Sequence, residues 1–256
     1  MNLLAQTLIE AQESKIPIDS FSKSHPELTL DDAYAIQTIT ANSRLKAGKK
    51  LVGYKIGLTS KEAQKQFQLF HPDFGHLFEH MRIPNGGELR RSDLIQPRIE
   101  VEIAFAVSKD IKGPGMTPED VARAIEYAVA AFEIVDSRIK DWKITAIDTV
   151  SDNGSSARFV LGEKKVKLDE LDLSTLGAAL LEDGEIVSTG VGGAVMNHPV
   201  NAATFLINEL GKYGKGLAAG DIILSGAMGP MVRMDANKTY TAEFLSMGQL
   251  SLRVTP

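Results

Sequence analysis

The amino-acid sequence predicts an α+β fold in which a curved or rolled β-sheet follows a helical N-terminal segment. Apolar residues recur at helical spacing over the first fifty residues, whereas strand-like segments broken by glycine dominate from residue 51 onward. One convincing helix, over residues 201–210, falls among the last hundred residues. Many strands with few helices and long glycine-rich connections are typical of this fold class. The predicted division is a helical segment over residues 1–50 and a sheet domain over residues 51–256.

Two helices are predicted in the N-terminal segment. The first has leucine or isoleucine at positions 3, 4, 8 and 9, and Pro17 stops it. The second begins at Thr29, with Asp32 three positions on as in a capping box, and ends at Gly48. This segment carries no obvious chemistry, and we interpret it as a packing or oligomer-contact element.

The sheet domain begins with a predicted strand over residues 51–57. Residues 59–62 have the pattern of a capping box and predict a helix start, and residues 85–87 are a turn signal. A long strand is predicted over residues 95–107. Pro118 at the first position of a helix then predicts a helix that runs toward Phe132, where residues 132–135 form a short buried strand.

The last hundred residues hold several further strand-like segments. A turn signal at Asp183 and Gly184 predicts a hairpin. The segments lie around Phe159 and over residues 178–181, 186–188, 222–224, 240–244 and 250–254.

Composition excludes several classes of protein. The 28 basic and 33 acidic residues give a net charge of −5, which argues against nucleic-acid binding. The absence of cysteine excludes disulfides, thiolate metal sites and thiol nucleophiles. No apolar run approaches the roughly 20 residues of a membrane helix, and the polar N-terminus is unlike a signal peptide. We therefore expect a soluble cytoplasmic protein.

A pair of glutamates in one strand is the most informative local feature. Side chains alternate along a strand, so Glu100 and Glu102 share one face of the predicted strand over residues 95–107. Two like charges on a mostly apolar strand repel each other, and a divalent cation would relieve that repulsion. Oxygen ligands favour Mg²⁺, Mn²⁺ or Ca²⁺ over zinc. The alternative interpretation is a solvated outer face of an amphipathic strand.

Glu133 favours the metal interpretation. It lies between Phe132 and two β-branched residues, where an unpaired carboxylate would be costly to bury. If its strand neighbours the strand with Glu100 and Glu102, three carboxylates converge on one hard cation. The alternative is a buried Glu133 paired with Arg138.

Three further sites could carry chemistry, although each signal is weak alone. Lys55 lies within an apolar and glycine-rich strand, either on a solvated face or as an amine with a lowered pKa. Asp73 occupies a turn-forming segment and alone resembles a turn residue. The polar loop over residues 152–156, which includes Ser155, suits substrate hydrogen bonds as well as a plain turn.

Other motifs do not support a different chemistry. The glycines at 190, 192 and 193 lack a surrounding βαβ unit, as a nucleotide-binding loop would require. The chain has no Walker lysine motif, no G-x-S-x-G elbow and no HExxH motif. His76 and His80 are four residues apart, and we interpret that spacing as chance or a solvated loop.

Taken together, the motifs of the chain resemble those of the fumarylacetoacetate hydrolase superfamily. More narrowly, they resemble the 2-hydroxypenta-2,4-dienoate (2-oxopent-4-enoate) hydratases and their sister 4-oxalocrotonate decarboxylases of aromatic meta-cleavage pathways. The resemblance covers nearly the whole chain. It is carried by GYKIGLTS (residues 53–60), PDFG (72–75), QPRIEVEIAF (96–105), FEIVDSRIKDWK (132–143), DTVSDNGSS (148–156) and GDIILSGAMGP (220–230).

The resemblance favours the hydratase branch over the decarboxylase branch. PDFG, QPR, the DWK of residues 141–143 and DTVSDN are similar to hydratase motifs. GHLF (residues 75–78) and SARF (156–159) are nearer to decarboxylases, and Gly154 departs from the alanine usual in its loop. A third hypothesis is a non-catalytic partner subunit of a sister enzyme, which would not require the retained candidate site residues.

The resemblance also implies a fold, a cofactor and site residues. The fold is the mixed β-roll catalytic domain of the superfamily, here residues 51–256, after the helical segment. Glu100, Glu102 and Glu133 would bind Mg²⁺ or Mn²⁺, which would stabilise negative charge on the substrate. Lys55 and Asp73 would transfer protons and position water, and Ser155 would hydrogen-bond the substrate. The family further implies homo-oligomers, and complexes between hydratase and decarboxylase.

Overall fold

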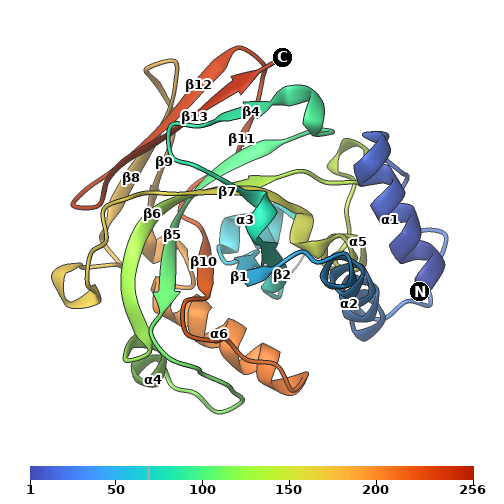
Figure 1. Ribbon diagram of the computed structural model, residues 1–256, viewed down its shortest axis with the longest axis horizontal. Helices are drawn as coiled ribbons and strands as arrows, with labels where there is room; N and C mark the ends of the chain where they lie inside the picture. Colours follow the sequence, from blue (N-terminus) through green and yellow to red (C-terminus); the bar gives the residue numbers. More distant parts are fainter. Residues whose placement is uncertain (68–69) are drawn as a thin grey trace.

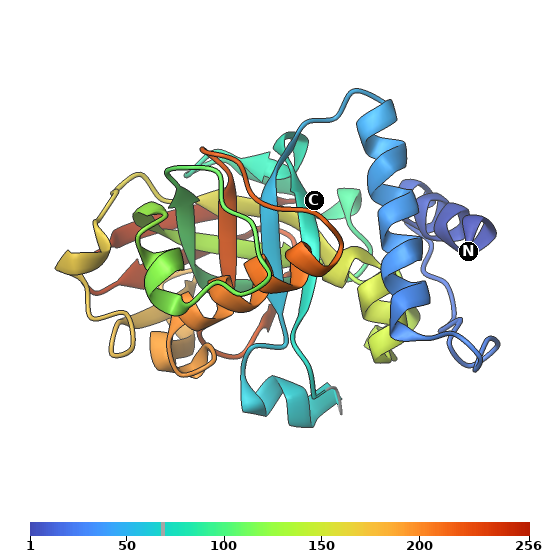
Figure 2. The ribbon, with the colours of Figure 1, turned by 90° about the horizontal axis from the view of Figure 1, so that it is seen from below.

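The computed structural model describes residues 1–67 and 70–256. In that part of the chain, the α-helices are α1 (Asn2–Ser14), α2 (Leu30–Lys46), α3 (Lys61–Phe67), α4 (Pro118–Ala122), α5 (Ala146–Ser151) and α6 (Pro199–Lys212). In both ribbon views, α1 and α2 lie at one end of the molecule, beside the sheets (Figures 1 and 2). None of the described helices is long and apolar enough to cross a lipid bilayer.

The larger of two sheets is mixed and strongly curved. Its strands are β1 (Leu51–Gly57), β2 (Asp73–Phe78), β3 (Arg82–Ile83), β5 (Arg98–Val107), β6 (Ile125–Val135), β7 (Ser156–Leu161), β10 (Ile222–Ala227) and β11 (Val232–Arg233). They follow the order β2-β1-β10-β5-β6-β7-β3, and β11 pairs with β5. The pairs β1–β10 and β3–β7 are parallel, and the others are antiparallel. The predicted α+β class with a rolled sheet is confirmed.

The smaller sheet packs against the larger one. Its strands are β4 (Glu88–Arg90), β8 (Gly177–Glu182), β9 (Glu185–Val191), β12 (Lys238–Phe244) and β13 (Gly248–Thr255), in the order β4-β13-β12-β8-β9. Asp183 and Gly184 form the predicted hairpin turn between β8 and β9, both with left-handed backbone. The strands predicted in the last hundred residues are confirmed.

The main hydrophobic core fixes which side chains face the site. It combines one face of the larger sheet with α6 and the smaller sheet, through side chains such as Ile103 of β5, Leu206 and Tyr240. Because side chains alternate along a strand, Glu100 and Glu102 of β5 point to the opposite face of the larger sheet. Lys55 of β1 shares that face, since Tyr54 and Ile56 on either side of it belong to the core.

The N-terminal helices pack on the sheet domain through an apolar cluster of their own. This cluster joins Leu8 of α1, Ile36 of α2 and Ile139, and α2 also contacts α5. The predicted capping box is confirmed, because Thr29 Oγ1 accepts from the Asp32 backbone N–H and Asp32 accepts from the Thr29 N–H. The division of the chain at residue 50 stays a prediction.

Two predictions of helix boundaries are wrong. The helix predicted from residue 117 toward Phe132 ends at Ala122, and β6 begins at Ile125. From Ala128 onward β6 is buried on both faces. Its apolar residues therefore do not alternate with polar ones, and its sequence pattern cannot be distinguished from that of a buried helix. At the start of α3, Ser60 rather than Thr59 is the cap, because Ser60 Oγ accepts from the Ala63 N–H at 3.1 Å.

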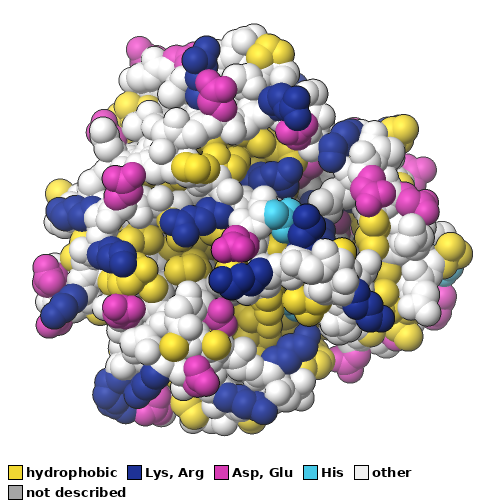
Figure 3. Space-filling model, viewed as in Figure 1, with side chains coloured by type: hydrophobic (Ala, Val, Ile, Leu, Met, Phe, Trp, Pro, Cys, Tyr) yellow, Lys and Arg dark blue, Asp and Glu magenta, His cyan; other side chains and the backbone are white. Residues whose placement is uncertain are grey.

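Charges are mixed on the face of the molecule that Figure 3 shows. On the face shown in Figure 3, basic and acidic side chains are interspersed, with hydrophobic side chains visible between them. No continuous field of one sign covers this face, in keeping with the small net charge of −5.

Candidate active site

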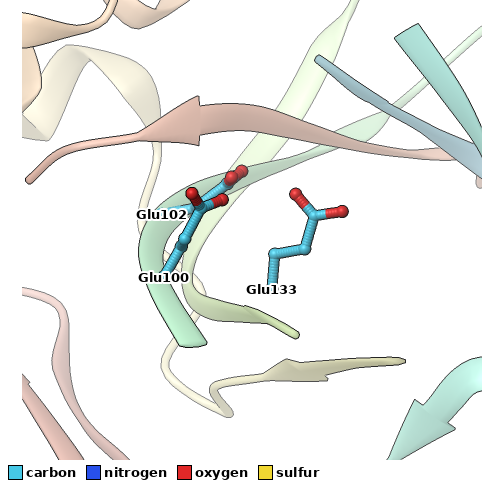
Figure 4. Close-up of side chains that lie close together, drawn as sticks. All are labelled: Glu100, Glu102 and Glu133. Carbon is cyan, nitrogen blue, oxygen red and sulfur yellow. The ribbon is translucent and has the colours of Figure 1, made fainter. Parts of the chain in front are cut away.

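Three glutamates meet on two neighbouring strands at the middle of the larger sheet. Glu100 of β5 lies directly opposite Glu133 of β6 in the antiparallel register, and Glu102 is two residues along. One carboxylate oxygen from each lies within 4.8 Å of the others. Figure 4 shows the three side chains extending to the same side of the two strands. The predicted convergence of the three carboxylates is therefore present. The alternative of a solvated outer face for the Glu100 and Glu102 pair is wrong for Glu102, which is fully buried, while Glu100 is half-buried.

These carboxylates have few hydrogen-bond donors. Glu102 Oε2 accepts from the Gly226 N–H at 2.8 Å. The other oxygen of Glu102 and Glu133 Oε1 have no hydrogen-bond partner among the described residues, and Glu133 Oε2 has only an ion pair with Lys55, without hydrogen-bond geometry. Burial, with Glu133 nearby, raises the pKa of Glu100 to about 7, and the same causes raise the pKa of Glu102. Buried carboxylate oxygens without donors are a set that a hard divalent cation would satisfy.

Lys55 is the cation that neighbours this cluster. Its Nζ lies 3.2 Å from Glu133 Oε2, and the residue is only 3% exposed. Burial acts to lower the pKa of the Lys55 amine, but Glu133 and Asp73 outweigh it and raise that pKa. The alternative of a solvated lysine is therefore wrong here, and in the absence of a bound cation the pKa of Lys55 is raised rather than lowered. The alternative pairing of Glu133 with Arg138 is also wrong.

Asp73 is the first residue of β2 and pairs with Gly57 at the end of β1. It is buried, and burial raises the pKa of its carboxyl group. A side chain on Gly57 would place a Cβ only 2.3 Å from Asp73 Oδ1, so the glycine is what lets this carboxyl approach β1. The interpretation of Asp73 as a plain turn residue is wrong, because it lies within the sheet beside Lys55.

The loop that carries Ser155 has an unusual backbone. Asn153, Gly154 and Ser155 all have φ near +60°, a region that non-glycine residues rarely adopt. The Asn153 side chain holds the loop to β2, accepting from the His76 N–H at 2.7 Å and donating to the His76 carbonyl at 3.0 Å. The left-handed turn keeps Ser155 at the wall of the cavity described below.

A buried ion pair behind this loop is a feature that the sequence analysis missed. The Arg138 guanidinium donates to the Asp152 carboxylate, and the Arg138 N–H donates to Asp152 Oδ2 at 3.0 Å. Burial raises the pKa of Asp152 to about 6, although Arg138 opposes the shift. Asp152 Oδ2 in turn lies 3.5 Å from Ser155 Oγ. The opposite charges of the DSR motif (residues 136–138) and the SDN motif (residues 151–153) were the available signal.

A small cavity unites the predicted site residues. This inner cavity has a volume of about 70 Å³ and is lined by Lys55, Asp73, Glu100 and Ser155 together with apolar side chains. Glu102 and Glu133 lie next to Glu100 in the carboxylate cluster. All six predicted residues are thus brought together. His76 and His80 are not, since His76 is buried against Asn153 and His80 is at the surface.

Comparison with known proteins gives a consistent result. A family model described as "Fumarylacetoacetate (FAA) hydrolase C-terminal" matches residues 43–255. A 2-keto-4-pentenoate hydratase of Paraburkholderia phymatum is 44% identical, over 96% of this chain and 94% of its own. A 2-oxo-hept-4-ene-1,7-dioate hydratase of Escherichia coli is 37% identical, over 98% and 96%. A solved structure of 4-oxalocrotonate decarboxylase from Pseudomonas putida G7, complexed with magnesium and adipate, has a TM-score of 0.96 and 34% identity, covering 99% and 96%.

Proposed function

Because the chain belongs to the fumarylacetoacetate hydrolase family, we propose that it is a metal-dependent hydro-lyase that converts 2-hydroxypenta-2,4-dienoate (2-oxopent-4-enoate) to 4-hydroxy-2-oxopentanoate in aromatic meta-cleavage catabolism. The observation that carries the proposal is the cluster of three buried glutamates beside a cavity lined by Lys55, Asp73 and Ser155. Support for the substrate comes from relatives that are named as 2-keto-4-pentenoate hydratases and are 42–44% identical.

We propose that Glu100, Glu102 and Glu133 hold one divalent cation, Mg²⁺ or Mn²⁺. The fit rests on their oxygen donors, on the oxygens that have no hydrogen-bond partner, and on their separation of at most 4.8 Å. Glu100 is part of the cavity wall, so a cation at this cluster would be accessible to substrate. When bound, the cation supplies Lewis-acid stabilisation of the negative charge that develops on the 2-oxo acid.

The remaining residues would bind the substrate and move protons. Ser155 Oγ would donate a hydrogen bond to the substrate carboxylate or 2-oxygen. Lys55 Nζ and the Asp73 carboxyl both line the cavity, so they would exchange protons with the substrate carbons and orient the water that adds at C4. Burial of both side chains keeps bulk water away from these proton transfers.

The second candidate is decarboxylation of 4-oxalocrotonate (2-oxo-3-hexenedioate). The near-complete structural match to a 4-oxalocrotonate decarboxylase, with a TM-score of 0.96, favours it. The same cation and enol chemistry would stabilise the product of carbon dioxide loss. We rank this candidate second because hydratase relatives are more similar in sequence, at up to 44% identity against 34%.

The deciding experiment mixes purified protein with freshly generated 2-hydroxypenta-2,4-dienoate and Mg²⁺, following ultraviolet absorbance and identifying the product. Formation of 4-hydroxy-2-oxopentanoate is the expected result, and chelator should abolish it. Carbon dioxide release from 4-oxalocrotonate without hydration of the dienoate would instead establish the second candidate. Metal-dependent binding of oxalate without turnover of either substrate would indicate a non-catalytic partner subunit.

A matched pair of variants tests the site itself. Ser155→Ala should lower kcat/KM by roughly tenfold or more, since it removes a hydrogen bond to the substrate while the loop keeps its other contacts. Glu126→Gln, at an exposed position on β6, is the control and should retain full activity. We also propose that the protein forms a homo-oligomer, and light scattering on the same preparations measures its mass in solution.

A further inference from the structure

Two cavities adjoin at the candidate active site. The inner cavity of about 70 Å³ shares Ser60, Ala63, Glu100, Ala227 and Met231 with an outer cavity of about 650 Å³. Trp142 lines the inner cavity and not the outer one, and Arg98 lines the outer cavity and not the inner one. Met231 lines both. These three side chains, which we call the partition, therefore lie where the two cavities meet.

The partition is held together by contacts of its own. The Arg98 guanidinium carbon lies 4.6 Å from the centroid of the Trp142 ring, and Arg98 Nη1 lies 3.6 Å from Met231 Sδ. The Trp142 indole N–H donates to the Gln96 carbonyl at 3.0 Å. Trp142 and Asp141 both have left-handed backbone, with φ of 55° and 57°. Left-handed backbone conformations cost free energy and persist where surrounding contacts hold them. The Trp142 side chain is therefore held in one position by its contacts with Arg98 and Gln96.

The chemistry of the inner cavity suits an uncharged substrate tail. Away from the carboxylates its walls include Leu58, Val135, Trp142 and Ile144. Lys55 is the single basic residue among the described residues that line it, and Lys55 is already paired with Glu133. A second carboxylate at the far end of a substrate would find no cation there. Burying it against apolar side chains would be costly.

We propose that the partition of Arg98, Trp142 and Met231 is the specificity determinant for the substrate tail, restricting the enzyme to 2-oxo and 2-hydroxy-dienoic acids with a short, uncharged tail. This inference rests on the proposed function. A longer tail would have to extend past the partition, where the inner cavity meets the outer one. Arg98 acts on the tail through Trp142, because its guanidinium keeps the indole in place and lies on the outer side of it.

The test compares binding of three stable saturated ligands in the presence of Mg²⁺: 2-oxopentanoate, 2-oxooctanoate and 2-oxoheptanedioate. Isothermal calorimetry should show that the wild-type protein prefers 2-oxopentanoate over each of the others by roughly tenfold or more. Trp142→Ala opens the inner cavity into the outer one, so it should remove or reverse the preference against 2-oxooctanoate. Met231→Ala should act in the same direction and serves if Trp142→Ala does not fold.

Arg98 is tested by a conservative and a neutral substitution. Arg98→Lys keeps a cation over the indole ring and should keep the wild-type preference, whereas Arg98→Gln should weaken it. Lys165→Gln is the matched control, because Lys165 lies 4.3 Å over the ring of Tyr127, away from the partition. That variant should bind all three ligands as the wild type does.

The outcomes separate this inference from the proposed function. Hydration of the dienoate by the wild-type protein tests the function, independently of the ligand series. Tail selectivity that is unchanged in folded Trp142→Ala and Met231→Ala would overturn the role of the partition. Equal binding of 2-oxoheptanedioate and 2-oxopentanoate by the wild type would overturn the preference for an uncharged tail.

Discussion

His76 is a buried imidazole that the proposed chemistry does not use. It is 3% exposed, its ring lies 5.0 Å from that of Tyr54, and its Nδ1 lies 3.3 Å from Asn153 Oδ1. Burial lowers the pKa of His76 to about 3, and the positive charges of Lys215 and Arg44 act in the same direction. The folded protein therefore keeps this side chain neutral at pH values where an unfolded chain protonates it.

This shift predicts how stability depends on pH. Above about pH 6.5 the imidazole is neutral in both the folded and the unfolded protein. As the pH falls from there toward 3, only the unfolded chain binds the proton, so the folded state loses stability relative to it. The free energy of unfolding of the wild-type protein should fall between pH 6 and pH 4. In His76→Gln that fall should be smaller, by about 1.4 kcal/mol for each pH unit. Urea unfolding over this range measures it. His71→Gln, at an exposed position, is the control; an equal change in both variants would contradict the assignment to His76.

For single residues, the sequence predicted the face and the burial of side chains better than it predicted their ion-pair partners. Strand alternation placed Glu100 and Glu102 on one face, and the apolar neighbours of Glu133 predicted its burial. The pairs Lys55–Glu133 and Arg138–Asp152 were not predicted. The first depends on how β1 and β6 are placed across the sheet, and local spacing carries no information about that placement.

Among the elements, three helices begin with the same device. Thr29 caps α2, Thr117 caps α4 and Thr145 caps α5, and each has an aspartate three residues on that completes a capping box. Among these three boxes, only that of α5 also binds residues far away in the sequence. Its Asp148 also accepts from Ser20 Oγ and Ser22 Oγ, both at 2.8 Å, and so ties the segment after α1 to α5.

The shared device allows a matched comparison of two aspartates. Asp32→Ala removes an exposed box and should lower the free energy of unfolding by about 1 kcal/mol. Asp148→Ala removes a box and leaves the buried Ser20 hydroxyl and the half-buried Ser22 hydroxyl without their acceptor, so it should cost about 3 kcal/mol or more. Chemical denaturation of the two variants measures the difference. Similar losses would show that the bonds from Ser20 and Ser22 contribute little.

The boundary of α4 shows why some elements could not be predicted. The sequence of β6 is rich in alanine, and Ala128, Ala130 and Ala131 are all fully buried there. Alanine has a high intrinsic helix propensity, and a strand buried on both faces lacks the alternation that would reveal it. Pairing with β5 on one side and β7 on the other overrides that propensity. The local sequence shows where turns occur, but pairing with neighbouring strands determines that this segment is a strand rather than a helix.

For the whole molecule, the carboxylate cluster destabilises the folded state when no cation is bound. Three acidic side chains share the middle of the larger sheet, and the one cation paired with them is Lys55 among the described residues. If they bind Mg²⁺ as proposed, cation binding stabilises the whole fold, by about 2.7 kcal/mol at a hundredfold excess over Kd.

Glu102→Gln separates the two effects. Removing one buried charge should raise the stability of the metal-free protein by roughly 1 to 3 kcal/mol, because repulsion and desolvation are relieved. The same change should weaken Mg²⁺ binding by roughly tenfold or more. Thermal unfolding with Mg²⁺ and with chelator measures both effects, against Glu126→Gln as the exposed control. A variant that keeps the wild-type response to Mg²⁺ would exclude Glu102 as a ligand.

The antiparallel register of β5 and β6 has a consequence for how the sequence of such a protein can change in evolution. The three glutamates lie on regular, paired strands, where an insertion or a shift by one residue would turn each of them to the other face. Trp142 and Met231, in contrast, lie outside the strands, Trp142 in a one-turn 3₁₀ helix and Met231 in the loop before β11, so replacing them leaves the register of β5 and β6 unchanged. Descendants of one ancestral chain can therefore acquire new substrate ranges while inheriting the same reactive centre unaltered.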